Sequence, residues 1–98
     1  MPTYDAPPNF LNQHSALAPD QKKRFRTAVD KFVSDLRKGQ GLNGVRPGLR
    51  VKGVRGAEGL YEMTWAPDGR AVFTLGPSRK GGEPHVIWLA VGTHAVLP

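Results

Sequence analysis

The sequence predicts an α+β fold in which two N-terminal helices pack on a four-stranded, mainly antiparallel sheet. Apolar residues recur at spacings of three and four in the first half of the chain, and after Gly48 the pattern changes to alternation. A run of helices followed by a run of strands is typical of helices that cover one face of a sheet. The 98 residues match the size of one domain, so we expect a single domain over residues 1–98.

The beginning of the chain predicts a loose arm and then a helical hairpin. Three prolines within residues 1–8 favour an arm, or at best one short edge strand. The hairpin is expected over residues 9–38. Asn9 is a suitable N-cap for a short first helix over residues 10–17, and a second, longer helix is expected to begin at Pro19.

The second helix has the clearest pattern in the sequence. Asp20 in its first turn complements the helix dipole, and Gly39 is a normal stop after its last turn. Its apolar residues form one continuous stripe, made of Phe25, Ala28, Val29, Phe32, Val33 and Leu36. We expect this stripe to pack on the sheet, while the basic first turns face solvent or touch phosphate.

Residues 49–97 are expected to form an antiparallel meander. Alternating apolar residues predict strands at residues 49–54, 60–65, 71–75 and 85–91. Residues 66–70 predict a hairpin turn, because proline, aspartate and glycine each favour a position of a tight turn. The last strand is almost continuously apolar, which is typical of a central strand covered on both faces.

The composition narrows the class of protein. Lysine and arginine number 14 against 8 acidic residues, a net charge of +6 that attracts nucleic acid, an acidic protein or an anionic membrane surface. The absence of cysteine excludes disulfides and thiolate metal sites and is typical of a reducing cytosol. No segment approaches the roughly 20 apolar residues of a membrane span, and the N-terminus lacks a signal-peptide pattern. We therefore expect a cytoplasmic protein.

The second half of the chain holds an ordered set of short motifs. They are the segments at residues 49–56, 60–65, 68–73 and 86–94. Together with the preceding helices, they resemble the RelE/ParE superfamily, the toxins of type II toxin–antitoxin pairs. In that family a basic residue and a glycine lead into a strand, an arginine opens the next strand, and the last strand ends in a glycine followed by a basic residue or histidine.

The resemblance implies a function as well as a fold. RelE-like toxins are endoribonucleases that cut messenger RNA in the ribosomal A site, by attack of a ribose 2′-hydroxyl on the adjacent phosphate. The implied partners are the ribosome, messenger RNA and a cognate antitoxin, with which a hetero-oligomer is expected. The implied chemistry needs no metal and no other cofactor.

The resemblance also implies site residues, position by position. Arg70 and Arg55 are expected to offset phosphate charge, because the arginine fork grips phosphate with two hydrogen bonds. Lys52 is expected to bind phosphate or act as the base. His94 is expected to be an acid or base, since imidazole transfers protons near neutral pH. The expected RNA-binding set is Arg50, Lys52, Arg55 and Tyr61.

Other interpretations remain open from the sequence. A ParE-like toxin has the same fold and inhibits DNA gyrase by binding, without chemistry. A third interpretation is an inactive member that binds only its antitoxin. Each charged site residue can also be explained as a solvated side chain beside a loop. His94 can be explained as a histidine that bonds a backbone carbonyl.

Overall fold

The computed structural model describes residues 3–78, 81 and 83–97. Its elements in chain order are β1 (Thr3–Asp5), α1 (Pro8–Ser15), α2 (Pro19–Leu36), η1 (Gly41–Gly44), η2 (Pro47–Leu49), β2 (Lys52–Gly53), β3 (Tyr61–Ala66), β4 (Gly69–Gly76), β5 (His85–Thr93) and η3 (His94–Val96), where η denotes a 3-10 helix. Within this part of the chain, no helix is long and apolar enough to cross a membrane.

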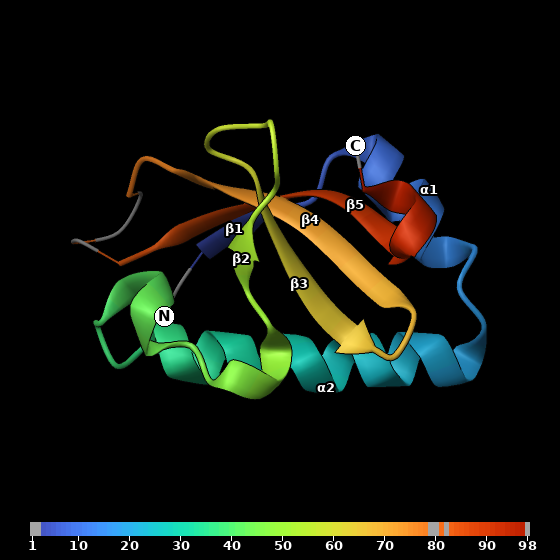
Figure 1. Cartoon of the computed structure of the whole chain (residues 1–98), viewed down its shortest axis with the longest axis horizontal. Coiled ribbons are helices and arrows are strands. Elements are labelled where there is room, and N and C mark those ends of the chain that lie inside the picture. Colours follow the sequence, from blue (N-terminus) through green and yellow to red (C-terminus); the bar gives the residue numbers. More distant parts are fainter. Residues whose placement is uncertain (1–2, 79–80, 82, 98) are drawn as a thin grey trace.

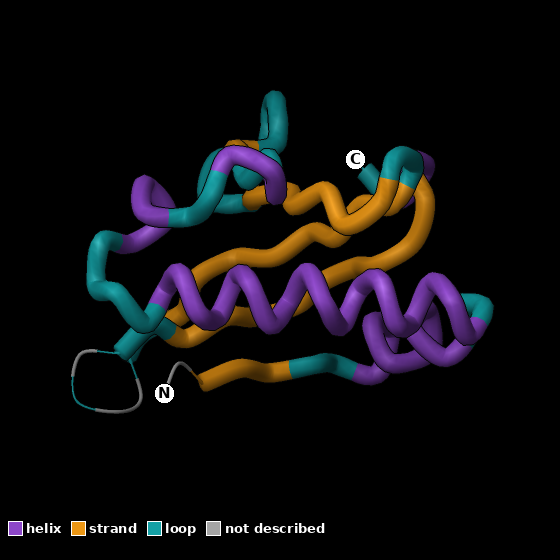
Figure 2. The backbone as a smooth tube through the Cα atoms, turned by 90° about the horizontal axis from the view of Figure 1, so that it is seen from below, coloured by secondary structure: helices purple, strands orange, loops and turns teal. Residues whose placement is uncertain are grey.

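The sheet has the strand order β1-β5-β4-β3-β2, and α2 runs along one of its faces (Figures 1 and 2). β2 to β5 are antiparallel neighbours, whereas β1 pairs with β5 in parallel. The predicted α+β class with two N-terminal helices is therefore confirmed. The predicted count of four strands is wrong, because the sheet has five.

The missed strand is β1, which lies in the region predicted as a loose arm. Its backbone pairs with β5, and Thr3 N–H also donates to the carbonyl of Pro84 at 3.0 Å. The buried ring of His85 joins the two strands, with Nδ1 2.6 Å from Thr3 Oγ1 and Nε2 2.9 Å from Asp5 Oδ2. Three residues are too few to show a strand period, so the local sequence could not reveal this pairing.

The region predicted as the first strand of the meander is mostly not a strand. Only Lys52–Gly53 pairs with β3, and the residues before it form η2. Arg50 explains the break, because its φ of 49° and ψ of 43° are left-handed and interrupt an extended chain. The later strands are longer than predicted at their C-terminal ends, and α1 begins at Pro8 rather than after an Asn9 cap.

Aromatic side chains from both helices form the core against the sheet. Phe10 of α1 lies 6.0 Å from Phe25 of α2 and 5.9 Å from Trp88 of β5, between ring centroids. Phe32 lies 5.1 Å from Phe73 of β4. Burial of each such side chain is worth roughly 1.5–3 kcal/mol, so the apolar stripe predicted for α2 is what fixes the helix on this face.

On β3, the opposite face of the sheet carries polar side chains. Met63 and Trp65 of β3 belong to the core, so alternation places Glu62 and Thr64 on the other face. η3 folds back against β4 and β5, where a Cβ added to Gly92 would lie 2.8 Å from Val96 Cγ1. The close approach of η3 explains why glycine stands at position 92.

Candidate functional site

A hollow of about 340 Å³ lies on the sheet face opposite α2. We call it the basic hollow. It is lined by Arg50, Val51, Lys52, Glu62, Thr64 and Arg70. Three cations and one carboxylate therefore meet on the floor and rim of one concave surface, which is the arrangement expected of a site for a phosphate group.

Strand register brings these residues together. Lys52 of β2 pairs with Glu62 of β3, and Thr64 of β3 pairs with Arg70 of β4. Residues that pair directly across antiparallel strands project from the same face. The hollow is therefore assembled from three strands that are separate in the sequence.

Arg50 lines the hollow and has an unusual, left-handed backbone conformation. Its φ is 49°, and among the described residues other than glycine no other φ is positive. A left-handed residue with a side chain costs of order 1 kcal/mol, and such residues cluster at functional sites. Here the turn connects η2 to β2, so that Arg50 and Lys52 line the same surface.

Glu62 is the residue that the sequence analysis missed. Its side chain is only 10% exposed, and one carboxylate oxygen lies 3.7 Å from Lys52 Nζ. A buried carboxylate among cations can hold an ordered position and accept a proton from a substrate hydroxyl. The available signal was an acidic residue, between Tyr61 and Met63, in a predicted strand whose other residues are uncharged.

Arg70 is anchored by one of its terminal nitrogens. Nη1 donates to the carbonyl oxygen of Gly69 at 2.9 Å, and more weakly to those of Pro67 and Ala66 at 3.3 and 3.4 Å. Within the described residues, Nε and Nη2 donate to no protein acceptor. The guanidinium is thus oriented by the β3–β4 turn and keeps one edge available for an anion.

His94 lies close to the hollow without lining it. Thr93, the residue before it, pairs with Gly69, and Arg70 pairs with Gly92. His94 is exposed and begins η3 at this end of β5. The register thus places the His94 backbone beside the strand end that supplies Arg70.

The fold is shared with solved structures of other proteins, although the sequence has no match. No family model matches the sequence, and no curated protein matches it either. The structure matches a copper-bound mutant toxin from Helicobacter pylori with a TM-score of 0.67, at 16% identity and with 100% of each chain covered. The chain has the fold of a toxin from a toxin–antitoxin pair.

Two further solved structures have this toxin fold. The E. coli DinJ–YafQ complex matches with a TM-score of 0.64 and 13% identity, over 99% of this chain and 98% of that one. The YoeB/ParE toxin from Agrobacterium tumefaciens matches with a TM-score of 0.56 and 14% identity, over 96% and 99%. The RelE/ParE resemblance predicted from the sequence is thus confirmed in the fold.

The structure brings some of the predicted site residues together and places others elsewhere. Arg50, Lys52 and Arg70 meet in the basic hollow, and His94 follows the strand end beside it. Arg55 is exposed in the turn between β2 and β3 and does not line the hollow. Tyr61 lies on the helix-facing side, where its ring stacks on Phe73 at 5.7 Å.

Proposed function

We propose that this chain is the toxin of a type II toxin–antitoxin pair and acts as a ribosome-dependent messenger-RNA endoribonuclease. The toxin fold supports the first part of the proposal. The observation that supports the second is the buried Glu62 carboxylate among three cations in the basic hollow. A hollow of that composition can bind a phosphodiester and also move a proton.

In the proposed reaction a ribose 2′-hydroxyl attacks the adjacent phosphorus. The bond from phosphorus to the 5′-oxygen of the next nucleotide breaks, which leaves a 2′,3′-cyclic phosphate and a free 5′-hydroxyl. Glu62 takes the proton from the 2′-hydroxyl, and His94, which lies beside the hollow, protonates the leaving oxygen. The route uses side chains alone as acid, base and cations.

The cations of the hollow have a separate task in this scheme. The pentacoordinate phosphorane gains negative charge on its equatorial oxygens, and positive groups aimed at them lower the barrier. Arg70 is the best placed of the cations for this role. The turn carbonyls hold its Nη1, and its Nε and Nη2 can donate to a phosphoryl oxygen. Arg50 and Lys52 complete the positive rim.

Induced expression in bacteria with primer-extension mapping of transcripts tests the proposal. Wild-type protein is expected to produce cuts within translated codons, and Arg70→Ala is expected to abolish them. Arg26→Ala is the matched control, since Arg26 is exposed on α2 and lines neither the basic hollow nor its rim. Codon cleavage that persists in Arg70→Ala would reject this site.

A binding inhibitor of DNA gyrase is the second candidate. It is favoured by the position of His94, whose side chain stands outside the hollow, and by the similarity to a structure described as a YoeB/ParE toxin. The two candidates differ in what stops first after induction. Translation stops first for the nuclease, and replication stops first, with intact transcripts, for the gyrase inhibitor.

A partner protein belongs to the same proposal. One of the matched structures is described as the E. coli DinJ–YafQ toxin–antitoxin complex. We propose that this chain likewise binds an antitoxin in a hetero-oligomer, alongside its proposed targets, the ribosome and messenger RNA.

A further inference from the structure

A hollow of about 420 Å³ lies on the flank of α2 where β1 and α1 are found (Figure 2). We call it the aromatic hollow, because the rings of Phe10, Phe25 and Trp88 line it. Tyr4 and Leu11 also line it, and these two residues are 68% and 53% exposed. Only three large apolar residues are exposed in the described part of the chain, so two of them meet at this one surface. Apolar side chains gathered on a surface are typical of a contact with another molecule.

Two opposite charges border the aromatic hollow. Arg26 and Asp30 lie one turn apart on the same side of α2, and both line the hollow. Neither side chain forms a hydrogen bond or an ion pair with another residue that the structure describes. Their formal charges cancel, although the chain as a whole carries a net charge of +6. The aromatic hollow is therefore a nearly neutral, apolar surface on a basic protein.

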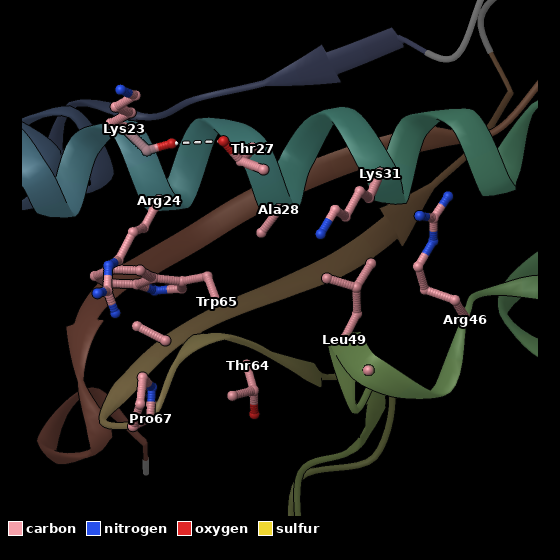
Figure 3. A pocket seen from close by; sticks show the side chains of 12 residues that line it. Lys23, Arg24, Thr27, Ala28, Lys31, Arg46, Leu49, Thr64, Trp65 and Pro67 are labelled. Atoms are coloured by element: carbon pink, nitrogen blue, oxygen red, sulfur yellow. Dashed lines mark hydrogen bonds between the residues drawn. The ribbon is translucent and has the colours of Figure 1, made fainter.

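The other flank of α2 has a different charge. The groove between α2 and η2, shown in Figure 3, is lined by Arg24 and Lys31, and no acidic residue lines it within the described ranges. Two copies of the chain would repel each other at that groove, because cations without partners would face one another. Polyanions favour the basic flank, whereas an apolar partner without excess charge favours the aromatic hollow.

We propose that the aromatic hollow is the interface of a symmetric dimer, and that its occupant is a second copy of this chain. The two copies of a two-fold dimer use the same surface, so that surface must complement itself. The aromatic hollow meets this requirement, because a concavity and two projecting apolar side chains lie next to each other. Leu11 and Tyr4 of one copy fill the hollow of the other.

The same two-fold axis pairs the charges. When the two copies of α2 run antiparallel and the axis passes midway between positions 26 and 30, Arg26 of each copy lies opposite Asp30 of the other. An ion pair then forms on each side of the axis, and the two side chains that lack a partner within the described chain gain one. A partner of unrelated sequence would have to supply both the apolar knobs and the reversed charges, whereas a second copy has them already.

Dimer formation leaves both basic hollows open, because the basic hollow lies on the sheet face opposite α2. The dimer is therefore independent of the proposed nuclease activity. One hollow of this size is typical of a small, transient contact, for which we expect a dissociation constant on the order of 10–100 μM. At about 1 μM the chain is then monomeric, so the stability of the monomer and the basic hollow are measured without the dimer.

Sedimentation velocity of the purified chain, from about 1 μM to 1 mM, tests the dimer. Wild type is expected to change from the mass of one chain to twice that mass as the concentration rises. Leu11→Asp is expected to weaken association at least about tenfold, because it places a charge in an apolar contact. Leu75→Asp is the matched control with little expected change, since Leu75 is exposed on β4 and does not line the aromatic hollow.

Complementary charge variants test the symmetric ion pair itself. Arg26→Asp leaves only acidic groups on both sides of the axis, and Asp30→Arg leaves only basic groups, so each variant alone is expected to associate at least about tenfold more weakly than wild type. In an equimolar mixture of the two variants, acidic groups face basic groups again, and association within about threefold of the wild-type affinity is expected. Circular dichroism of both variants checks that α2 is intact.

Three results would overturn the proposal. They are a wild-type chain that stays monomeric up to about 1 mM, a dimer that Leu11→Asp leaves as tight as wild type, and a mixture of the two charge variants that associates no better than either variant alone. These measurements use the purified chain without RNA and are separate from the transcript mapping. Failure of either experiment therefore leaves the other interpretable.

Discussion

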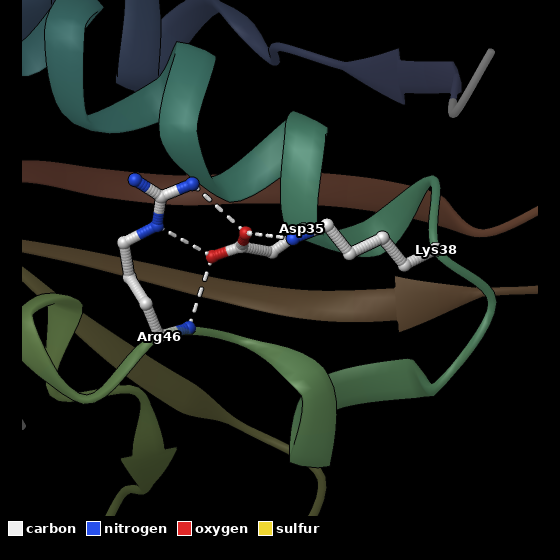
Figure 4. Close-up of polar contacts among 3 residues, drawn as sticks. All are labelled: Asp35, Lys38 and Arg46. Atoms are coloured by element: carbon white, nitrogen blue, oxygen red, sulfur yellow. Dashed lines mark hydrogen bonds and ion pairs between the residues drawn. The ribbon is translucent and has the colours of Figure 1, made fainter.

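Arg46 grips Asp35 with two parallel hydrogen bonds and a third from its own backbone (Figure 4). Nε and Nη2 donate to the two carboxylate oxygens at 2.8 and 2.9 Å, and Arg46 N–H donates to Oδ2 at 2.9 Å. The clamp joins the last turn of α2 to the segment before η2. That segment leads directly to Arg50, so the clamp supports the basic hollow that Arg50 lines.

We predict that the clamp makes stability dependent on acid pH. The hydrogen bonds from Arg46 hold the pKa of the Asp35 carboxyl well below its ordinary value. A carboxyl with a lowered folded pKa stabilises the fold above its unfolded pKa, about 4, and this contribution is lost as the pH falls below that value.

Urea unfolding over a pH series measures this effect. Asp35→Asn is expected to be less stable than wild type at pH 7, and the difference is expected to shrink progressively below about pH 4. Asp30→Asn, at an exposed position of the same helix, is the control with little expected difference. A difference between wild type and Asp35→Asn that is constant from neutral to acid pH would contradict the assignment.

Glu62→Gln is predicted to uncouple RNA binding from cleavage. The amide is the same size as the carboxylate but cannot accept the 2′-hydroxyl proton, so cleavage on purified ribosomes is expected to slow by about 100-fold or more. Binding of the uncleaved message is expected to persist, since the rim cations remain. Cleavage by Glu62→Gln at the wild-type rate would remove Glu62 from the mechanism.

Gly69→Ala is predicted to destabilise the fold through the β3–β4 turn. A Cβ at this position would lie 2.6 Å from Trp65 Cδ2 and Cε2, deep in the core. Forcing such a contact typically costs about 1–3 kcal/mol. Thermal unfolding checks the loss against Gly48→Ala, where an added Cβ meets nothing within 4 Å and no loss is expected. Equal melting temperatures for the two variants would refute the tight contact.

Thr3→Val is predicted to loosen β1 selectively. The variant keeps a β-branched side chain but removes the hydroxyl 2.6 Å from His85 Nδ1, which leaves a buried nitrogen unbonded. The local penalty is about 1–3 kcal/mol. Hydrogen exchange is expected to quicken at the amides of β1 and remain unchanged in β3 and β4. Thr27→Val on the exposed face of α2 is the control, and unchanged β1 exchange in Thr3→Val would contradict the role of His85.

The sequence alone determined the features that depend on local periodicity. The apolar stripe of α2, the turn between β3 and β4 and the largely apolar β5 can each be read from neighbouring residues, because side-chain period and turn chemistry are local properties. The ordered motifs also predicted the toxin fold.

Only the tertiary structure decided which distant residues meet. β1 is a strand because β5 offers it hydrogen bonds, and Glu62 meets Lys52 because the two residues pair across β2 and β3. Arg55 and Tyr61 resemble site residues in sequence, yet strand register leaves them outside the basic hollow. Pairing, register and the closure of a groove depend on contacts across the whole chain, and no short window of residues records them.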